Sequence, residues 1–288
     1  MPDKQLYDYQ RNWPVNPYAP AESHEAKAPF IDNGSGPISK ERYYSLAWME
    51  RERTHLWARV WNWAGRVEDI PEPGDFFTFK IGLENFIVVR CEDHSIRAFF
   101  NVCPHRGNRL VWDEMGSLSE GFTCPFHNWH FKFNGEIESV TDRETFREEA
   151  LKRNLDLSEI RCEIWEGFIF INMNAESECL TNHLGPLPDH AAPYKLKDMR
   201  IMRRVQSVWD ANWKVGFDGF AEGYHVHCIH PQILSTFNDY HFQIDLYPNG
   251  VSRAISKFAE ESPRLKNKSI NPGLKSIMEE VGIDPDNF

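Results

Sequence analysis

The stretch CPHRG at residues 103–107 and the stretch CPFHNWHFKFNGE at residues 124–136 decide how this chain folds. Each begins with a cysteine followed by a proline, and each has a histidine two or three residues after that cysteine. Proline fixes the backbone φ angle and removes a backbone donor, which suits a tight loop wrapped around a metal. We therefore expect the two loops to bring four ligands to one centre, namely Cys103, His105, Cys124 and His127.

Short runs of aromatic and β-branched residues surround both loops, and such runs favour strands. Strands are predicted at residues 76–81, 86–91, 96–102, 130–133, 136–140 and 162–172. The pair Asn134-Gly135 between two of them is a hairpin signal, because both residues tolerate positive φ. These segments predict a small antiparallel β domain over residues 40–160, with an attached helix.

The remaining segments are organised around that domain. Ser39 is predicted to cap an amphipathic helix that runs from Lys40 to near Gly65. Prolines make residues 175–197 a linker, and a further segment opens near Met202 with a strand-like run. The predicted organisation is an extended arm over residues 1–39, the metal-binding β domain with its helix over 40–175, and a partial second domain over 176–288.

Two cysteines and two histidines allow two kinds of metal centre. One is a structural zinc ion bound tetrahedrally by all four side chains. The other is a Rieske [2Fe–2S] cluster, in which two cysteines hold one iron and two histidines hold the other. Zinc fingers usually pair Cys with Cys and His with His locally, whereas each loop here is mixed, which favours the Rieske arrangement. Without a metal, the four residues would be two buried thiols and two ordinary histidines.

The stretch NWKVGFDGFAEGYHVHCIHP at residues 212–231 holds a second group of candidate metal ligands. A helix is predicted over roughly residues 213–226. On that helix Asp218, Glu222 and His225 would share one face, because they lie four and then three residues apart.

His230 follows His225 by five residues, or about 500° around a helix. A regular helix would turn the two rings apart, so it must end or distort near His227 if both bind one metal. Two histidines and a carboxylate with open coordination positions are typical of non-haem Fe(II) oxygenases. The alternative is that these are scattered histidines near a helix end.

The two loops resemble those of the Rieske domain in ring-hydroxylating oxygenase α subunits. The resemblance implies an α+β fold, with an antiparallel β Rieske domain followed by the N-terminal part of a helix-grip (START-like) catalytic domain. Arg106 and Trp129 stand at positions similar to the family's and are expected to pack in support, while His130 is expected at the surface or beside a ligand. The implied ligands of the Rieske [2Fe–2S] cluster are Cys103, His105, Cys124 and His127.

The stretch over residues 212–231 is similar to the mononuclear Fe(II) site of the same family. His225 and His230 match its iron-binding histidines. Glu222 matches the acidic residue that links an iron ligand to a cluster histidine of the neighbouring subunit, a path for electrons. Many members have Asp there, and Glu resembles the branch that acts on quaternary ammonium compounds. Asp218, where the family often has Asn, is a second catalytic candidate.

The resemblance does not extend to the third iron ligand of the family. The third iron ligand of the family is an aspartate that lies well over a hundred residues beyond the second histidine, but only 58 residues follow His230. We therefore expect the sequence to be the N-terminal part of a longer oxygenase subunit, with an incomplete iron site. The tail aspartates, none of which stands in the family's context, are Asp239, Asp245, Asp284 and Asp286.

The function that the resemblance implies is the terminal oxygenase component of a Rieske non-haem iron system. Such a component hydroxylates an aromatic or other apolar organic substrate with O2. Because no G-x-G-x-x-G motif is present, electrons from NAD(P)H would arrive through a separate reductase, with or without a ferredoxin. The resemblance also implies a homotrimer, with or without a β subunit. The alternatives are a monooxygenase of a quaternary ammonium compound and a Rieske electron-transfer protein without oxygenase activity.

Composition narrows the partners and the compartment. The 288 residues carry 32 Lys and Arg against 43 Asp and Glu, a net charge of −11 that argues against nucleic-acid binding. No apolar run approaches the roughly 20 residues of a membrane helix. The N-terminal residues lack the apolar stretch of a signal peptide, which predicts a cytoplasmic protein. In that compartment the six cysteines are expected to be thiols or metal ligands.

Overall fold

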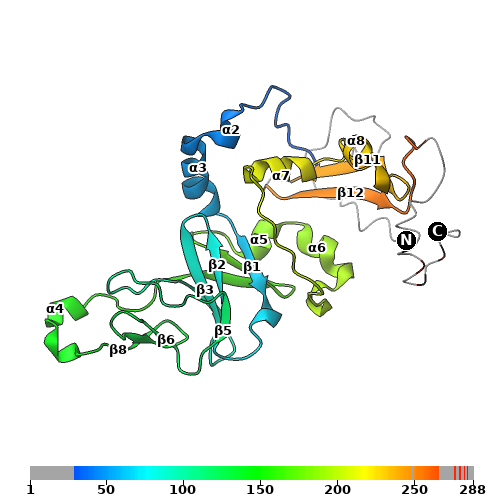
Figure 1. Ribbon diagram of the computed structural model, residues 1–288. Coiled ribbons are helices and arrows are strands. Elements are labelled where there is room, and N and C mark those ends of the chain that lie inside the picture. Colours follow the sequence, from blue (N-terminus) through cyan, green and yellow to red (C-terminus); the bar gives the residue numbers. More distant parts are fainter. Residues whose placement is uncertain are drawn as a thin grey trace. The chain divides into compact units, whose positions relative to one another are not determined.

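The computed structural model describes residues 29–247 and 250–265, together with residues 276, 279, 282 and 284. The chain divides into two compact units, which Figure 1 shows with their elements labelled. One unit runs from Ser45 to Arg204, and the other is built from the segments before and after it. Among the residues described, no helix combines the length and the apolar character needed to cross a membrane.

The Ser45–Arg204 unit is mostly β structure. Its strands are β1 (Asn62–Arg66), β2 (Asp75–Ile81), β3 (Glu84–Arg90), β4 (Ile96–Phe100), β5 (Met115–Ser117), β6 (Phe122–Thr123), β7 (His130–Phe131), β8 (Ile137–Ser139), β9 (Glu159–Trp165) and β10 (Phe168–Asn172). Seven of them form an antiparallel sheet in the order β1-β10-β9-β4-β3-β2-β5. The other three form a small sheet in the order β6-β7-β8. The second Cys-Pro loop connects β6 and β7.

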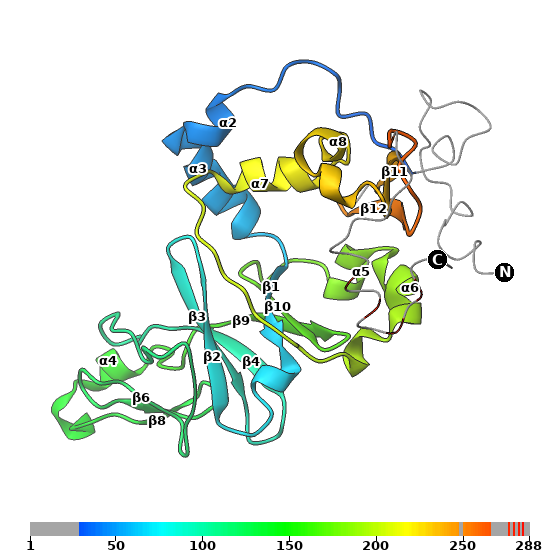
Figure 2. The same ribbon diagram turned by 45° about the vertical axis from the view of Figure 1, so that its right-hand side comes forward.

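The helices of this unit are short. They are α3 (Leu46–Glu52), α4 (Glu148–Leu151), α5 (Leu180–Leu184) and α6 (Leu187–Ala191). Figures 1 and 2 agree in placing α4 and the small sheet at one end of the unit, and α5 and α6 at the other. The Cys-Pro loop between β6 and β7 therefore lies at the end that carries α4.

Strand β3 shows how the large sheet separates two hydrophobic cores. All four side chains from 86 to 89 are buried. Alternate side chains of a strand point to opposite faces, so Ile87 and Val89 enter one core whereas Phe86 and Val88 enter the other. The first of these cores also contains both cysteines of the Cys-Pro loops. The candidate cluster site is thus anchored on a sheet buried on both faces.

Most of the predicted strands are confirmed. The strands expected at 76–81, 86–91 and 96–102 are β2, β3 and β4, and those expected at 130–133 and 136–140 contain β7 and β8. The hairpin expected between the last two is also present, because β7 and β8 pair antiparallel and Gly135 has a φ of 88°.

The helix predicted to run to near Gly65 is wrong in its last part. After α3 a π-helical turn extends it only to Trp57, and the next element is strand β1. Asn62 explains the stop, because its side-chain amide donates to the carbonyls of Trp57 and Val60 at 3.1 and 3.0 Å. These bonds satisfy carbonyl groups that the end of a helix leaves open.

Three further expectations need correction. The single strand predicted at 162–172 is two strands, β9 and β10, joined at Glu166-Gly167. These two residues have φ of 48° and 82°, as a two-residue hairpin turn requires. The strand-like run near Met202 is wrong, because residues 201–209 adopt no strand. The predicted linker at 175–197 contains α5 and α6.

The other unit contains the helices α2 (Glu41–Tyr44), α7 (Trp213–Phe220) and α8 (Val226–Ile229), and a hairpin of β11 (Phe237–Leu246) and β12 (Ser252–Phe258). As predicted, Ser39 caps the first of these, since its hydroxyl accepts the amide of Glu41 at 3.3 Å. Asn212 caps α7 in the same way by accepting the amide of Lys214 at 3.1 Å. Val226 of α8 is buried in a small core against the β11–β12 hairpin.

Gly135→Ala is expected to destabilise the Ser45–Arg204 unit by about 2–4 kcal/mol, from left-handed strain and overpacking together. A Cβ at Gly135 would lie 2.4 Å from Cε1 of the buried Phe99. Gly82→Ala is the matched control, because Gly82 has a φ of 58° but no atom lies within 4 Å of a Cβ there. Thermal unfolding should show a loss of only about 1 kcal/mol in the control. Equal losses in the two variants would contradict the packing argument.

Candidate metal centres

The two Cys-Pro loops have the same backbone hydrogen-bond pattern. In each, the cysteine carbonyl accepts the amide of the residue four positions on, from Gly107 at 2.9 Å and from Asn128 at 2.8 Å. Both of these residues have positive φ, 74° and 57°. The amides of Cys103 and Cys124 in turn donate to the carbonyl five positions on, at 2.7 and 2.8 Å. Each loop is therefore a preformed turn that holds its cysteine and histidine in place.

The side chains of the four predicted ligands lie in two close pairs, the thiols of Cys103 and Cys124 and the rings of His105 and His127. Cys103 and Cys124 are each 1% exposed, and the ring centroids of His105 and His127 are 4.6 Å apart. The Nδ1 atom of His105 is buried and has no hydrogen-bond partner within the part of the chain that the structure describes. A buried ring nitrogen without a partner is costly, unless a metal takes its lone pair. The four side chains fit a metal centre on this observation.

The raised pKa of the Cys103 thiol also fits a metal centre. Burial raises the pKa of Cys103 to about 11, with the neighbouring Cys124 thiol adding to the effect. Such a thiol stays protonated at neutral pH unless a cation replaces its proton. Iron that binds here would therefore displace the proton and neutralise a thiolate that the buried site otherwise disfavours.

The arrangement suits a two-iron cluster. In the described ranges, no three or more His, Cys, Asp or Glu side chains lie close enough together to hold one metal ion. A [2Fe–2S] cluster asks for only two protein ligands per iron, two cysteines on one and two histidines on the other. The paired thiols and the paired imidazoles meet that requirement.

The neighbours of the loops support them by packing. Trp129 stacks on His105 with ring centroids 4.5 Å apart and an interplanar angle of 6°. Arg106 lies over the ring of Phe126 at 5.6 Å. His130 lies near Thr123 Oγ1 and the Glu120 carbonyl, both 2.7 Å from its ring nitrogens, so it supports the second loop at its base.

The second group of candidate ligands flanks α8. His225 precedes the helix and His230 follows it, and their ring centroids are 5.4 Å apart at an interplanar angle of 77°. Two imidazoles on one ion, each bound at about 2.1 Å, have centroids about 5 Å apart. The interruption expected near His227 is present but lies earlier, since α7 ends at Phe220 and α8 begins at Val226.

Glu222 forms the turn between the two helices. Its Oε1 lies 2.5 Å from Nδ1 of His225, and its Oε2 accepts the amide of His225 at 3.1 Å and that of Tyr224. Burial raises the pKa of Glu222, but these hydrogen bonds outweigh it and leave the pKa below its ordinary value. The carboxylate therefore fixes the tautomer of His225 and leaves Nε2 available to a metal.

Gly223 allows this turn to lie close to strand β11. A Cβ at Gly223 would be 2.8 Å from the ring of Phe242, so a larger residue would push the turn away. The glycine between Glu222 and His225 thus has a steric role.

Asp218 does not share a face with Glu222 and His225, contrary to the prediction. Its carboxylate accepts a hydrogen bond from the Tyr43 hydroxyl at 2.5 Å and another from Arg42 at 3.4 Å, both on α2. The expectation rested on a continuous helix, whereas the structure has a turn after Ala221. The two contacts with α2 had no signal in the local sequence, because they join residues more than 170 positions apart.

Two of the tail aspartates, Asp245 and Asp239, form ion pairs with arginines. The buried carboxylate of Asp245 pairs with Arg253, and that of Asp239 lies 3.0 Å from Arg264 Nε. Asp284 is exposed, and Asp286 lies outside the described residues. Among the residues described, no third His, Cys, Asp or Glu joins His225 and His230 in a metal-binding group.

An antiparallel β unit that brings a Cys-Pro-His loop against a Cys-Pro-Phe-His loop defines a Rieske-type iron–sulfur protein. Residues 60–152 match the Rieske [2Fe–2S] domain, and residues 196–272 match the catalytic domain of the ring-hydroxylating α subunit. The chain therefore belongs to the Rieske oxygenase α subunits, with an antiparallel Rieske domain and part of the catalytic domain. The cofactors of these two domains are a Rieske [2Fe–2S] cluster and a mononuclear iron.

Individual relatives agree with this assignment. The chain is 32% identical over 207 residues to the carnitine monooxygenase oxygenase subunit of Acinetobacter pittii, an alignment that covers 71% of this chain and 54% of that protein. It is 36% identical over 195 residues to the large oxygenase component of a Ralstonia naphthalene 1,2-dioxygenase system, covering 64% of this chain and 42% of that protein.

A solved structure extends the agreement to the fold. The crystal structure of the quaternary ammonium Rieske monooxygenase CntA in complex with an inhibitor superposes with a TM-score of 0.62 at 27% identity, covering 74% of this chain and 62% of that one. The chain spans about half the length of the curated relatives that it matches.

Proposed function

We propose that this chain acts in the terminal oxygenase component of a Rieske non-haem iron system, which hydroxylates an aromatic or other apolar organic substrate with O2. The proposal rests on one observation, namely that two features occur together in this chain. These are the paired Cys/His loops and the turn in which Glu222 holds His225 opposite His230.

The proposed roles follow from the chemistry of each side chain. Cys103 and Cys124 would hold one iron of the cluster, and His105 and His127 the other. His225 and His230 would hold the mononuclear iron, which when bound supplies open coordination positions for O2.

The proposed role of Glu222 is twofold. Toward its own chain it keeps the proton on Nδ1 of His225 and so directs the lone pair of Nε2 to the metal. Its side chain is also 40% exposed, which leaves an edge for a cluster histidine of a neighbouring subunit. For Asp218 we propose an indirect role, because its contacts with Tyr43 and Arg42 position α7.

A second candidate substrate class is a quaternary ammonium compound. Glu at position 222 resembles the branch that acts on such compounds, and the relatives at 32% and 27% identity carry carnitine or quaternary ammonium in their names. Turnover assays with carnitine and with naphthalene would separate the two classes.

The proposed partners are those of the family. Electrons from NAD(P)H would come through a reductase, with or without a ferredoxin, and the assembly would be a homotrimer with or without a β subunit. A cytoplasmic location is proposed as well, because none of the six cysteines is paired in a disulfide, as a reducing compartment favours.

Metal analysis tests the proposal directly. An oxygenase subunit should contain about three irons and two acid-labile sulfides per chain, whereas a Rieske electron-transfer protein would contain two of each. Purified protein should also couple NADH oxidation to substrate hydroxylation when a Rieske reductase is added. Zinc without sulfide would contradict the proposal outright.

His225→Ala is expected to lose at least nine-tenths of the mononuclear iron while keeping both cluster irons and the sulfide. The reason is that one of only two described iron-site imidazoles is removed. His227→Ala is the matched control, because that ring faces Asp239, 3.7 Å away, and should leave all three irons in place. Iron and sulfide measured on the same samples provide the check. Equal iron loss in the two variants would remove His225 from the site.

A further inference from the structure

Residues 141–153 form a strap across both Cys-Pro loops. Near its start, the hydroxyl of Thr141 donates to the carbonyl of Asn128, directly after His127, at 3.2 Å. At its end, the guanidinium of Arg153 donates to the carbonyl of Pro104, directly before His105, at 3.1 Å. The strap therefore joins the backbone of one loop to that of the other at the positions beside the two histidines.

Phe146 lies in the middle of this strap and faces His105. Its ring meets that of His105 edge-on, with centroids 6.2 Å apart and an interplanar angle of 75°. It also meets Trp129 edge-on at 6.0 Å. Because Trp129 stacks flat on His105, the imidazole has an indole on one face and a phenyl ring nearby. Phe146 is itself only partly buried and packs against the core that holds both cluster cysteines.

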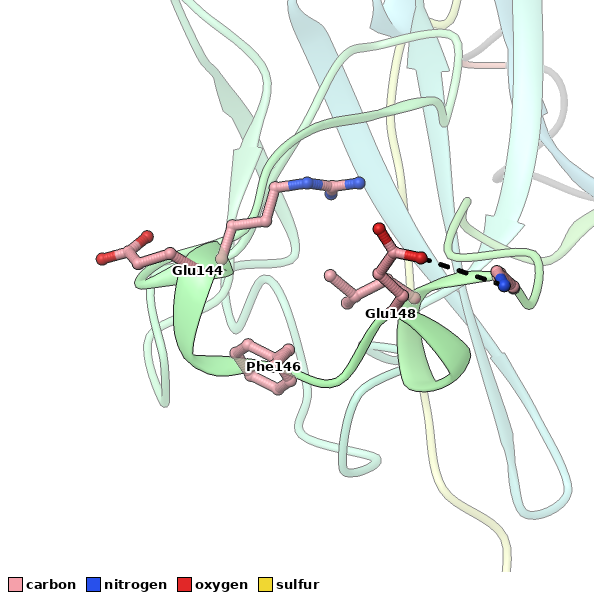
Figure 3. A pocket seen from close by; sticks show the side chains of 6 residues that line it. Glu144, Phe146 and Glu148 are labelled. Atoms are coloured by element: carbon pink, nitrogen blue, oxygen red, sulfur yellow. Dashed lines mark ion pairs between the residues drawn. The ribbon is translucent and has the colours of Figure 1, made fainter.

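An open cavity of about 670 Å³ is lined by residues of the strap. It is lined by Arg143, Glu144, Phe146, Glu148, Leu151 and Lys152. Figure 3 shows the Phe146 ring between the turn that carries Glu144 and the one that carries Glu148, whose carboxylate is 4.0 Å from Lys152 Nζ. The other lining residues are mostly charged, so we expect water to fill the cavity. Phe146 both lines this cavity and contacts His105.

We propose that Phe146 is a barrier that limits the access of the water of this cavity to His105, which is itself only partly buried, and thereby lowers the reduction potential of the cluster. The inference rests on the cluster ligands of the proposed function. Phe146 touches no reacting group, so it acts as a positioning and shielding residue.

The sign follows from charge. With two ferric ions, two sulfides, two thiolates and two neutral imidazoles, the oxidised cluster has no net charge. One electron from the reductase converts one ferric ion to ferrous and leaves a net charge of −1. Water stabilises the charged state more than the neutral one, and an apolar shell sets the potential by controlling solvent access. Removing the barrier should therefore make the potential more positive.

The test is a redox titration of full-length holoprotein, followed by its visible absorbance. Phe146→Ala should shift the midpoint potential to a more positive value, and Phe146→Leu should shift it less. Leu151→Ala is the matched control, because Leu151 lines the same cavity and packs against the same core, whereas the side chain that meets His105 is that of Phe146. The control should keep the wild-type potential.

A second measurement reports on water itself. Pulsed EPR of the reduced protein in D2O should show stronger deuterium coupling to the cluster in Phe146→Ala than in wild type or in Leu151→Ala. If Phe146→Ala does not hold a cluster, Phe146→Leu is expected to show both effects in smaller measure. An unmoved potential in a cluster-containing Phe146 variant, or an equal shift in Leu151→Ala, would overturn the inference. A wild-type protein without labile sulfide would instead refute the proposed function.

Discussion

Cys124→Ala should remove the Rieske cluster, with labile sulfide falling below a tenth of the wild-type content and the visible absorbance and EPR signal of the cluster lost. Cys124 is one of only two cysteines in the loops, and it is 1% exposed, so water cannot easily take its place as a ligand. Because each iron of a Rieske cluster has two protein ligands, losing one thiolate leaves its iron with a single protein contact. Sulfide analysis and EPR of the purified variant provide the measurement.

Cys91→Ala provides the control for that prediction. Cys91 is 3% exposed, belongs to the same core as Cys103 and Cys124, and donates a hydrogen bond from its thiol to the Phe133 carbonyl at 3.3 Å. Its replacement creates a small cavity in the same core, and the cluster should survive it. If the Cys91 variant lost its colour as well, the effect of Cys124→Ala would reflect core packing rather than ligation.

The strands of the Rieske domain could be predicted because each carries its own local pattern. In β3 the four buried side chains from 86 to 89 pack into two cores, one on each face of the sheet. An apolar run bounded by turn residues is therefore sufficient to predict this strand. The Asn134-Gly135 turn could likewise be predicted, because these two residue types favour the conformation of a hairpin turn. The Cys-Pro loops could be recognised for the same reason, because their ligands lie within a few residues of each other.

The predictions of secondary structure are wrong where a single polar residue or a long-range contact determines the local structure. One side-chain amide, that of Asn62, ends the helix that the apolar spacing extended to Gly65. The Glu166-Gly167 turn falls inside the single strand predicted over residues 162–172, because the residues on both sides of it are β formers. Both features depend on the hydrogen bonds and the backbone conformation of individual residues. The periodicity of apolar residues does not predict these.

The arrangement of the residues predicted for the iron site could not be derived from the sequence. Periodicity placed Asp218, Glu222 and His225 on one helix face. In the structure the Glu222 carboxylate accepts two backbone amides and ends the regular helix, which separates Asp218 from the histidines. A side chain that competes for backbone amides favours a turn over a helix interior. The same turn brings the rings of His225 and His230 to 5.4 Å.

Glu222→Ala should keep the cluster and most of the mononuclear iron, yet reduce coupled hydroxylation by about 10- to 100-fold, the range seen when groups that orient metal ligands are removed. Without the carboxylate, His225 loses the 2.5 Å contact that holds its tautomer. In an assembled oxygenase the proposed link to the neighbouring subunit would be lost too. Single-turnover product yield from protein with a pre-reduced cluster measures the effect, with iron and sulfide determined on the same samples.

Glu222→Gln separates the two parts of this role. Its amide oxygen can still accept a hydrogen bond from the Nδ1–H group, so the tautomer of His225 should be kept while the negative charge is lost. If tautomer control dominates, the Gln variant should recover most of the product yield. If the charge matters for electron transfer between subunits, it should remain near the Ala variant. Asp210→Ala, which removes an exposed carboxylate from the same unit, should leave the yield unchanged. Wild-type yield in Glu222→Ala would eliminate both roles and leave Glu222 as a residue that only shapes the turn.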